Sequence, residues 1–160
     1  MIDATLIRAH QHASGACGGQ EHQALGKSCG GFSSKIHAKV DALGMPLEFI
    51  VTAGQKQEIS FSEALLGEEI SEYLLADRGY DSDPFREKLR GRGTIPVIPG
   101  KKNRCVEIEY DKQIYRERNC VERFFNRIKH FRRLATRYDK THAMYLGGLL
   151  LVSILIWIKF

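Results

Sequence analysis

The sequence predicts an α/β fold in which one mixed sheet carries helices on both of its faces. Two observations point to this class: three strand patterns lead the chain, and helical and strand patterns then alternate up to residue 98. Leading strands of this kind form antiparallel pairs, whereas a helix–strand alternation adds parallel strands, so the sheet is mixed. The length of 160 residues fits one domain, which we place at residues 1–160.

The first third of the chain predicts one strand followed by a hairpin. Apolar and β-branched residues at positions 2–7 are typical of a strand. Residues 10–34 are rich in Gly, Ser, His and Gln and predict a long loop. Polar and apolar residues alternate over 34–41, a turn follows at Gly44, and residues 47–53 form the second strand of the hairpin.

The middle of the chain predicts two helix–strand pairs. A helical spacing of apolar residues covers 60–70, and a short apolar strand pattern follows at 73–76. A second helix runs over 84–90, with a proline in its first turn and glycines after its last. Residues 95–98 form a further short strand, and a basic loop covers 100–112.

The clearest helical pattern runs from residue 115 to residue 136. Its apolar residues recur at intervals of three and four, which predicts one helix with a single buried stripe. The stripe consists of Val121, Phe124, Ile128, Phe131 and Ala135. Residues 143–158 are uncharged and mostly apolar. They fall short of the ~20 residues that span a bilayer, so they predict a helix buried against the sheet rather than a membrane segment.

Basic residues gather in one part of the chain. Residues 78–137 hold 17 Lys and Arg against 8 Asp and Glu, a net charge of +9, while the remaining residues carry a net charge of −4. A stretch this basic indicates either a polyanionic partner or a solvated basic face.

Cysteine and histidine residues give no disulfide or metal-binding framework. The four cysteines, at positions 17, 29, 105 and 120, form no Cys-x-x-Cys pair. His10 and His12 could share a metal ion, but no further ligand follows at a recognisable spacing, so a role in the loop is favoured. Free thiols, together with a start that lacks a secretory signal, predict a cytoplasmic protein.

Three carboxylates lie at informative places. Asp3 is in the first strand, Asp77 is at the carboxyl end of strand 73–76, and Glu122 is on the polar side of the predicted helix. Taken singly, Asp77 could be a turn residue and Glu122 part of a surface ion pair. Together, three carboxylates could bind two Mg²⁺ ions, which prefer oxygen ligands. Such a pair would activate the attacking oxygen and stabilise the leaving oxygen of a phosphoryl displacement.

The polar side of the same helix surrounds Glu122 with an aromatic ring, an amide and cations. At about 100° per residue, five side chains share the face of Glu122. They are Tyr115, Arg118, Asn126, Lys129 and Arg133. This face is either a surface ion-pair network or a contact surface for nucleic-acid phosphates.

The same residues carry a resemblance to a known family. Gaps of two, three and six residues separate the members of the set Tyr115, Arg118, Glu122 and Lys129. This spacing matches the Tyr-(2)-Arg-(3)-Glu-(6)-Lys signature of bacterial insertion-sequence transposases. Residues 2–5 (Ile-Asp-Ala-Thr) and 75–81 (Leu-Ala-Asp-Arg-Gly-Tyr-Asp) resemble the blocks around the first and second catalytic aspartates of these enzymes. The chain resembles the DDE transposases of the insertion-sequence-5 family, within the insertion-sequence-4-like group.

This resemblance implies a ribonuclease-H-like fold and a catalytic domain that nicks DNA at the element's ends and transfers the freed 3′-hydroxyl. Asp3, Asp77 and Glu122 would be the catalytic residues and would bind two Mg²⁺ ions, with Mn²⁺ as a substitute. Tyr115, Arg118 and Lys129 would contact transposon-end DNA or orient Glu122, and Arg133, on the same helix face, is a further predicted DNA-binding residue. The implied partners are transposon-end and target DNA, and further copies of the chain assembled on that DNA.

The chain differs from the family pattern at its start. Members carry an upstream region that binds the terminal repeats, whereas Met1 stands two residues before Asp3. We therefore expect the upstream region to be absent. The chain would be the downstream frame of a split transposase, partnered by an upstream-frame product, or a truncated remnant. Two further functions stay open: another two-metal nuclease of the same fold, and a DNA-binding remnant without catalysis.

Overall fold

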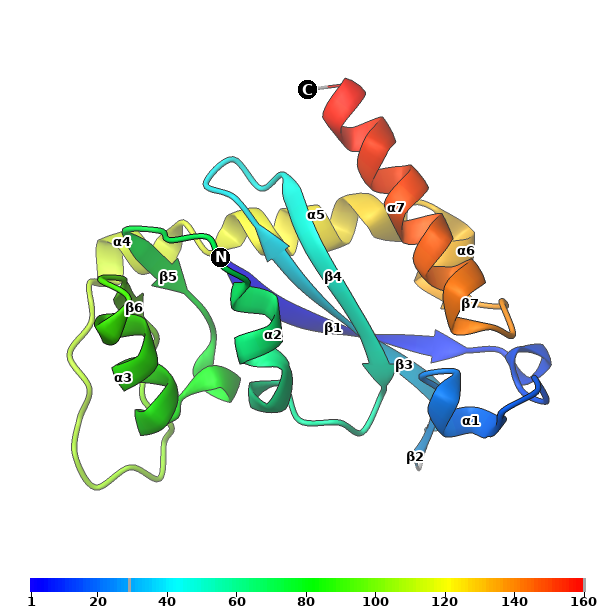
Figure 1. Cartoon of the computed structure of the whole chain (residues 1–160), viewed down its shortest axis with the longest axis horizontal. Coiled ribbons are helices and arrows are strands. Elements are labelled where there is room, and N and C mark those ends of the chain that lie inside the picture. Colours follow the sequence, from blue (N-terminus) through cyan, green and yellow to red (C-terminus); the bar gives the residue numbers. More distant parts are fainter. Residues whose placement is uncertain (29, 160) are drawn as a thin grey trace.

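A computed structural model describes residues 1–28 and 30–159, and it contains a mixed main sheet (Figure 1). The strands of this sheet are β1 (Ile2–Ala9), β2 (Gly26–Ser28), β3 (Gly31–Val40), β4 (Pro46–Ala53) and β7 (Thr136–Arg137). Strand β3 pairs antiparallel with β1 on one edge and with β2 and β4 on the other, and β7 adds a short parallel pairing to β1. The predicted α/β class with a mixed sheet is confirmed.

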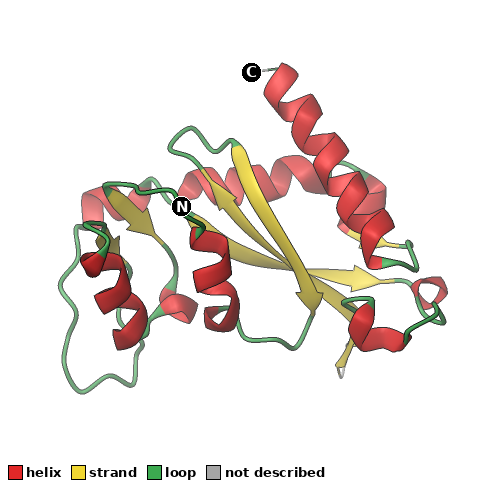
Figure 2. Cartoon of the chain, in the orientation of Figure 1, coloured by secondary structure: helices red, strands yellow, loops and turns green. Residues whose placement is uncertain are grey.

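Two strands stand apart from the main sheet. They are β5 (Tyr73–Leu75) and β6 (Ile95–Val97), which pair parallel with each other. The sequence predicts both strands but places them in one sheet with the others. Instead, β5 meets β1 through side chains, because Ile2 packs in the same buried cluster as Leu74 and Ala76. Contact through side chains rather than a backbone ladder leaves two sheets (Figure 2).

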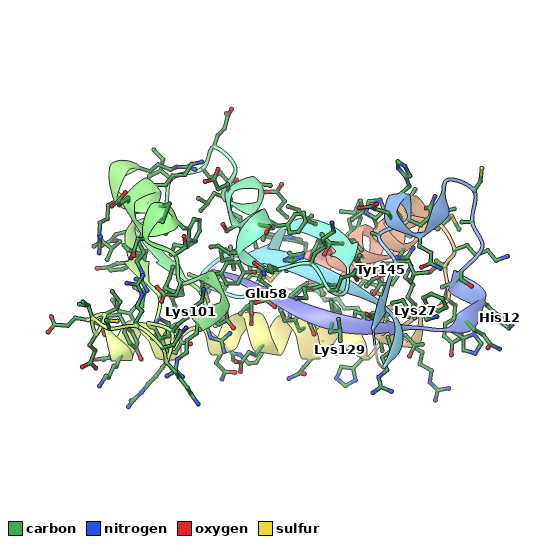
Figure 3. All side chains as sticks on the ribbon, turned by 90° about the horizontal axis from the view of Figure 1, so that it is seen from below. His12, Lys27, Glu58, Lys101, Lys129 and Tyr145 are labelled. Atoms are coloured by element: carbon green, nitrogen blue, oxygen red, sulfur yellow. The ribbon has the colours of Figure 1, made fainter. Side chains whose placement is uncertain are left out.

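Helices cover both faces of the main sheet, as predicted. The α-helices are α1 (Gly19–His22), α2 (Ser62–Leu66), α3 (Asp83–Gly91), α4 (Lys112–Arg116), α5 (Asn119–Lys129), α6 (Arg132–Ala135) and α7 (His142–Ile158). The 3₁₀ turns are η1 (Gln11–Ala13), η2 (Ile59–Phe61) and η3 (Arg78–Tyr80). Figure 3 shows α5 along one side of β1, with α2 on the other side.

Two buried clusters hold these layers together. The larger joins β3 and β4 to α5 and α7, through residues such as Ile36, Val121, Phe124 and Tyr145. The smaller joins the start of β1 to α2, β5 and α3, through residues such as Ile2, Leu65, Leu74 and Phe85. Burial of apolar surface contributes about 25 cal/mol per Å², so these clusters dominate the stability of the fold. The start of β1 therefore lies at the boundary between the two clusters.

The predicted single helix over 115–136 is wrong, because the structure contains three helices there. Helices α4 and α5 are joined by a tight turn, in which Val121 donates its amide to Arg118 three residues back. Helix α5 ends at Lys129, and Phe131 has an extended backbone with φ −83° and ψ 106°. A tight helical turn preserves an apolar spacing of three and four, so that spacing could not reveal the first break.

Two other predicted boundaries are also wrong. The expected loop over 10–34 contains α1, β2 and the start of β3. The expected helix over 60–70 ends at Leu66, because Gly67 follows with φ +59° and ψ −155°, a conformation that glycine tolerates. Ile70 consequently lies outside the helix, with 74% of its surface exposed.

Helix α7 packs on the sheet along one side only. Tyr145 and Leu149 are fully buried on this side, and Trp157 donates its indole N–H to the carbonyl of Pro46 at 2.9 Å. Leu151 and Ile154 on the other side are more than half exposed. The prediction that this segment packs against the sheet is confirmed for one side of the helix. Within residues 1–28 and 30–159, no helix is long and apolar enough to cross a membrane.

The buried carboxylate of Asp81 ties the segment after η3 to the basic loop. One carboxylate oxygen accepts from Nε and Nη2 of Arg86 at 3.0 and 2.9 Å. The other accepts from the amide of Lys101 at 2.8 Å and from Nε of Arg104 at 2.7 Å. Burial opposes ionisation, but these hydrogen bonds outweigh it and hold the pKa of Asp81 below its usual range.

The histidines and cysteines singled out in the sequence have local roles or none. His10 precedes η1, where its Nδ1 accepts a hydrogen bond from the amide of His12 at 3.3 Å, which supports the loop role. Cys17, Cys105 and Cys120 are free thiols. The fourth cysteine, Cys29, lies outside the described residues.

Candidate active site

Asp3 reaches the site from the start of β1. Side chains alternate along a strand, so Asp3, Thr5 and Ile7 share the face of β1 that α5 covers. The ladder pairs Asp3 with Ala38 of β3, which fixes its position in the sheet. Only 9% of the residue is exposed, and one carboxylate oxygen accepts from the amide of Ala4 at 2.8 Å.

Arg118 joins Asp3 to Glu122. It stands immediately before α5, and its Nη1 donates to a carboxylate oxygen of Asp3 at 2.7 Å. Its Nη2 donates to Glu122, one helical turn further on. The ring of Tyr115 packs against the guanidinium, with its centroid 5.7 Å from Cζ. One cation thus holds two carboxylates that are 119 positions apart.

Asp77 enters the same region from the end of β5. Its carboxylate accepts from the amide of Gly79 at 2.8 Å and so caps η3. Its negative charge acts on the ionisation of Asp3 and of Arg118, so all three lie within one electrostatic neighbourhood. Of the three carboxylates predicted from the sequence, Asp3 and Glu122 therefore contact Arg118 directly, and Asp77 acts on it through its charge.

The surroundings of Asp3 disfavour the ionised form of its carboxyl. Burial raises the pKa of the Asp3 carboxyl from 3.8 to about 6. The Ala4 amide and the Arg118 guanidinium lower it, whereas the charges of Asp77 and Glu58 raise it further. The site holds more negative charge than Arg118 neutralises.

Comparison with known proteins identifies the family. The family model described as "Transposase DDE domain" matches residues 1–157.

The chain belongs to this transposase family.

Two relatives of this transposase domain come from insertion sequences. A Brucella ovis protein named as a transposase for insertion sequence element IS6501 is 33% identical over 132 residues, which cover 79% of this chain and 99% of that protein. A Burkholderia cepacia protein named as a transposase for insertion sequence element IS402 is 32% identical over 119 residues, covering 67% of this chain and 54% of that protein. No solved structure matches. The resemblance to DDE transposases of insertion sequences is confirmed, and the assignment to the insertion-sequence-5 family stays a prediction.

The donor atoms of the transposase site suit a hard divalent cation. Asp3, Asp77 and Glu122 offer carboxylate oxygens, the ligands that Mg²⁺ prefers. Among the described residues, however, no three acidic, histidine or cysteine side chains are grouped as a ready metal site. Arg118 lies between Asp3 and Glu122 and is the cation that a metal ion would displace. The carboxylates fit the ion in chemistry, and the guanidinium stands where positive charge is needed.

The structure separates the predicted DNA-contacting residues of the transposase domain into two groups. Tyr115 and Arg118 are at the carboxylates. Lys129 lies at the other end of α5, where it donates to Oγ1 of Thr5 at 2.8 Å (Figure 3). Arg133 lies beyond that end, on α6, and pairs with Asp139. The expectation that one helix presents all of them is wrong because α5 ends at Lys129.

Sequence reasoning missed two residues of this neighbourhood, Glu58 and Tyr80. Glu58 stands in a polar stretch after β4, with no spacing that ties it to the motif residues. Tyr80 lies in the block around Asp77, but a tyrosine there is equally typical of a turn. Only the tertiary structure brings them to Asp3, because both connections span tens of residues.

Replacing Asp3 by Asn is expected to stabilise the metal-free transposase domain at alkaline pH. The folded-state pKa is raised, so the stability contributed by Asp3 is complete below pH 3.8 and is lost as the pH rises through about 6. Ionised Asp3 then costs as much as ~3 kcal/mol at pH 8, which the neutral amide avoids.

Urea unfolding of both proteins in EDTA, at pH 4 and pH 8, measures this effect. The free energy of unfolding of the Asn variant should exceed that of the wild type at pH 8, and the difference should shrink at pH 4. The control is Glu87→Gln on the exposed surface of α3, which should show no such dependence on pH. A loss of stability at pH 8 would mean that the ion pair with Arg118 outweighs the burial of Asp3.

Proposed function

We propose that this domain catalyses Mg²⁺-dependent phosphoryl transfer on DNA, nicking the ends of an insertion sequence and joining the freed 3′-hydroxyl to a target. The observation that supports the proposal is the bridge from Arg118 to Asp3 and Glu122, with the charge of Asp77 acting on the same guanidinium. A catalytic triad of this kind needs carboxylates that are distant in sequence to lie near one another.

Asp3, Asp77 and Glu122 would hold two Mg²⁺ ions, or Mn²⁺ in their place. Bound there, the ions supply Lewis-acid activation of the attacking oxygen and stabilisation of the leaving oxygen. The burial of Asp3 favours metal binding, because an ionised carboxylate that burial and like charges destabilise gains most from a nearby cation.

The cationic side chains would position the DNA. With Asp3 and Glu122 holding metal, the guanidinium of Arg118 would be free to bind a phosphate in a bidentate manner. Tyr115 supports that guanidinium from one side. Lys129, at the other end of α5, and Arg133, on α6, would contact the phosphate backbone of the DNA further along.

The proposal extends to the fold and the assembly. The antiparallel order of β1, β3 and β4, followed by α2, β5, α3 and β6, supports a ribonuclease-H-like domain over residues 1–160. Copies of the chain would assemble on the two ends of the element, because both ends must be cut and joined together. A product of an upstream frame would supply recognition of the terminal repeats.

The experiment is a strand-transfer assay. A labelled duplex that carries the terminal repeat flanking the reading frame, with a free 3′-hydroxyl, is incubated with the full chain, supercoiled plasmid and Mg²⁺. Joining of the label to the plasmid, lost in EDTA, is the expected result. Nicking without joining would indicate another nuclease of this class, and DNA binding without either reaction would indicate a non-catalytic remnant; both would overturn the proposal.

A further inference from the structure

Glu58 brings a fourth carboxylate to the site. It stands immediately before η2, but its side chain does not cap that turn. One oxygen accepts from Nζ of Lys35 at 3.2 Å, and about a quarter of the side chain is exposed. Figure 3 shows Glu58 beside β1, between the segments of α2 and η3. Its carboxylate is therefore partly exposed and has one oxygen that is not paired with Lys35.

The second oxygen of Glu58 and a carboxylate oxygen of Asp77 both lie close to Gly79. A Cβ atom built on Gly79 would lie 2.5 Å from Oε2 of Glu58 and 2.9 Å from Oδ1 of Asp77. Both carboxylates thus border the same backbone position, and a side chain there would collide with both. Two carboxylates brought this close repel each other unless a cation lies between or beside them. The glycine leaves room for that proximity.

Tyr80 supplies a second, independent observation. Its side chain is fully buried, and its hydroxyl has no hydrogen-bond partner among the described residues. After burial, the charges that raise its pKa are those of Glu58, Asp3 and Asp77, so the hydroxyl lies within the field of the carboxylates. A buried hydroxyl without a partner is uncommon in folded proteins. An oxygen held among these carboxylates, such as a water ligand of a cation, would give it one.

The charge balance points to the same occupant. Asp3, Glu58, Asp77 and Glu122 carry four negative charges, and the cations in contact with them are Lys35 and Arg118. Lys35 pairs with Glu58, and Arg118 pairs with both Asp3 and Glu122. A net charge of two remains unmatched, which a divalent cation would neutralise.

We propose that Glu58 is a fourth metal-binding carboxylate of the active site, paired with Asp77, and that the Tyr80 hydroxyl donates a hydrogen bond to an oxygen of the bound ion's water shell. This inference rests on the proposed metal-dependent function and adds two residues to it. Lys35 takes the place of the ion at Glu58 in the metal-free chain, as Arg118 does at Asp3.

The assignment is tested by measuring Mn²⁺ binding to the full chain by calorimetry, in the absence of DNA. Glu58→Gln is expected to weaken binding by about 10- to 100-fold, and Tyr80→Phe by about tenfold, while both remain folded. The matched control is Glu63→Gln, which removes an exposed carboxylate in α2 and should bind Mn²⁺ like the wild type. A merely structural Tyr80 would leave Mn²⁺ affinity unchanged when its hydroxyl is removed.

The outcomes separate this inference from the function on which it rests. If Asp77→Asn loses Mn²⁺ binding but Glu58→Gln and Tyr80→Phe bind like the wild type, the fourth carboxylate is overturned and the triad stands. If the wild type binds no Mn²⁺, or binds it as well without Asp77, the metal-dependent function is overturned as well. If Glu58→Gln unfolds, Tyr80→Phe decides the result, since Phe keeps the buried ring.

Discussion

Replacing Asp77 by Asn is expected to reduce DNA cleavage and strand transfer by ~10³-fold or more while leaving DNA binding largely intact. In the proposed function this carboxylate is a metal ligand, and stabilisation of transition-state charge by a metal amounts to several kcal/mol, at 1.36 kcal/mol for each tenfold in rate. The amide keeps the size of the side chain and can still accept from the Gly79 amide, so η3 should keep its cap.

Lys129→Ala is expected to have the reverse effect, on DNA binding rather than on the rate of reaction. Lys129 lies away from the carboxylates and contacts only Thr5 in the described structure. Its loss should weaken DNA binding and lower the slope of log affinity against log salt by about 1, with a smaller effect on the rate once DNA is saturating. Fluorescence anisotropy at several salt concentrations and single-turnover cleavage measure the two effects.

Two results with these variants would contradict the proposed roles of Asp77 and Lys129. If Asp77→Asn loses binding together with cleavage, the carboxylate serves the DNA contact or the fold rather than the chemistry. If Lys129→Ala leaves the salt slope unchanged, this end of α5 does not meet phosphate. Either result would redraw the division of roles between the acidic and basic parts of the site.

Replacing Asp81 by Ala is expected to destabilise the domain by about 3–5 kcal/mol, because it leaves Arg86 buried without its ionic partner. The side chains of both residues are at most 2% exposed, and Arg86 keeps only its hydrogen bond to the carbonyl of Ile98. For a chain of this size, thermal unfolding should shift down by roughly 6–20 °C.

Asp83→Ala is the control for this change. Asp83 pairs with the same Arg104, but its side chain is 67% exposed. Loss of an exposed pair costs about 1 kcal/mol or less, so the melting temperature should barely move. A double variant, Asp81→Ala with Arg86→Met, should recover part of the loss, since no uncompensated charge is then buried. Equal melting temperatures for the two single variants would contradict the central place of Asp81.

Local chemistry explains why part of the fold could be predicted from sequence. Helix α3 has Pro84 in its first turn and ends at Gly91, and β5 is a short apolar run before Asp77, so both match their predictions closely. The pairing of Arg118 with Glu122 follows from their spacing of four on a helical segment. Signals of this kind lie within a few residues of the structure they specify.

The remainder depended on tertiary contacts that no local pattern carries. The break before α6 comes from the extended backbone at Phe131, and its consequence is that Arg133 leaves the face of Glu122. Glu58 stands 19 positions from Asp77 and reaches it only because η2 and η3 fold against the same end of β1. Residues that meet across such separations cannot be found from periodicity.

If metal and DNA bind as proposed, the bridge that Arg118 makes between Asp3 and Glu122 would couple the two binding equilibria. One guanidinium cannot neutralise two carboxylates and a phosphate diester at the same time, so whichever ligand arrives first lowers the work of admitting the other. Such linkage is reciprocal: DNA would increase the affinity for the ion by the same factor as the ion would increase the affinity for DNA. Away from its element, the protein would then rest in a self-neutralised state that keeps its hydrolytic chemistry silent.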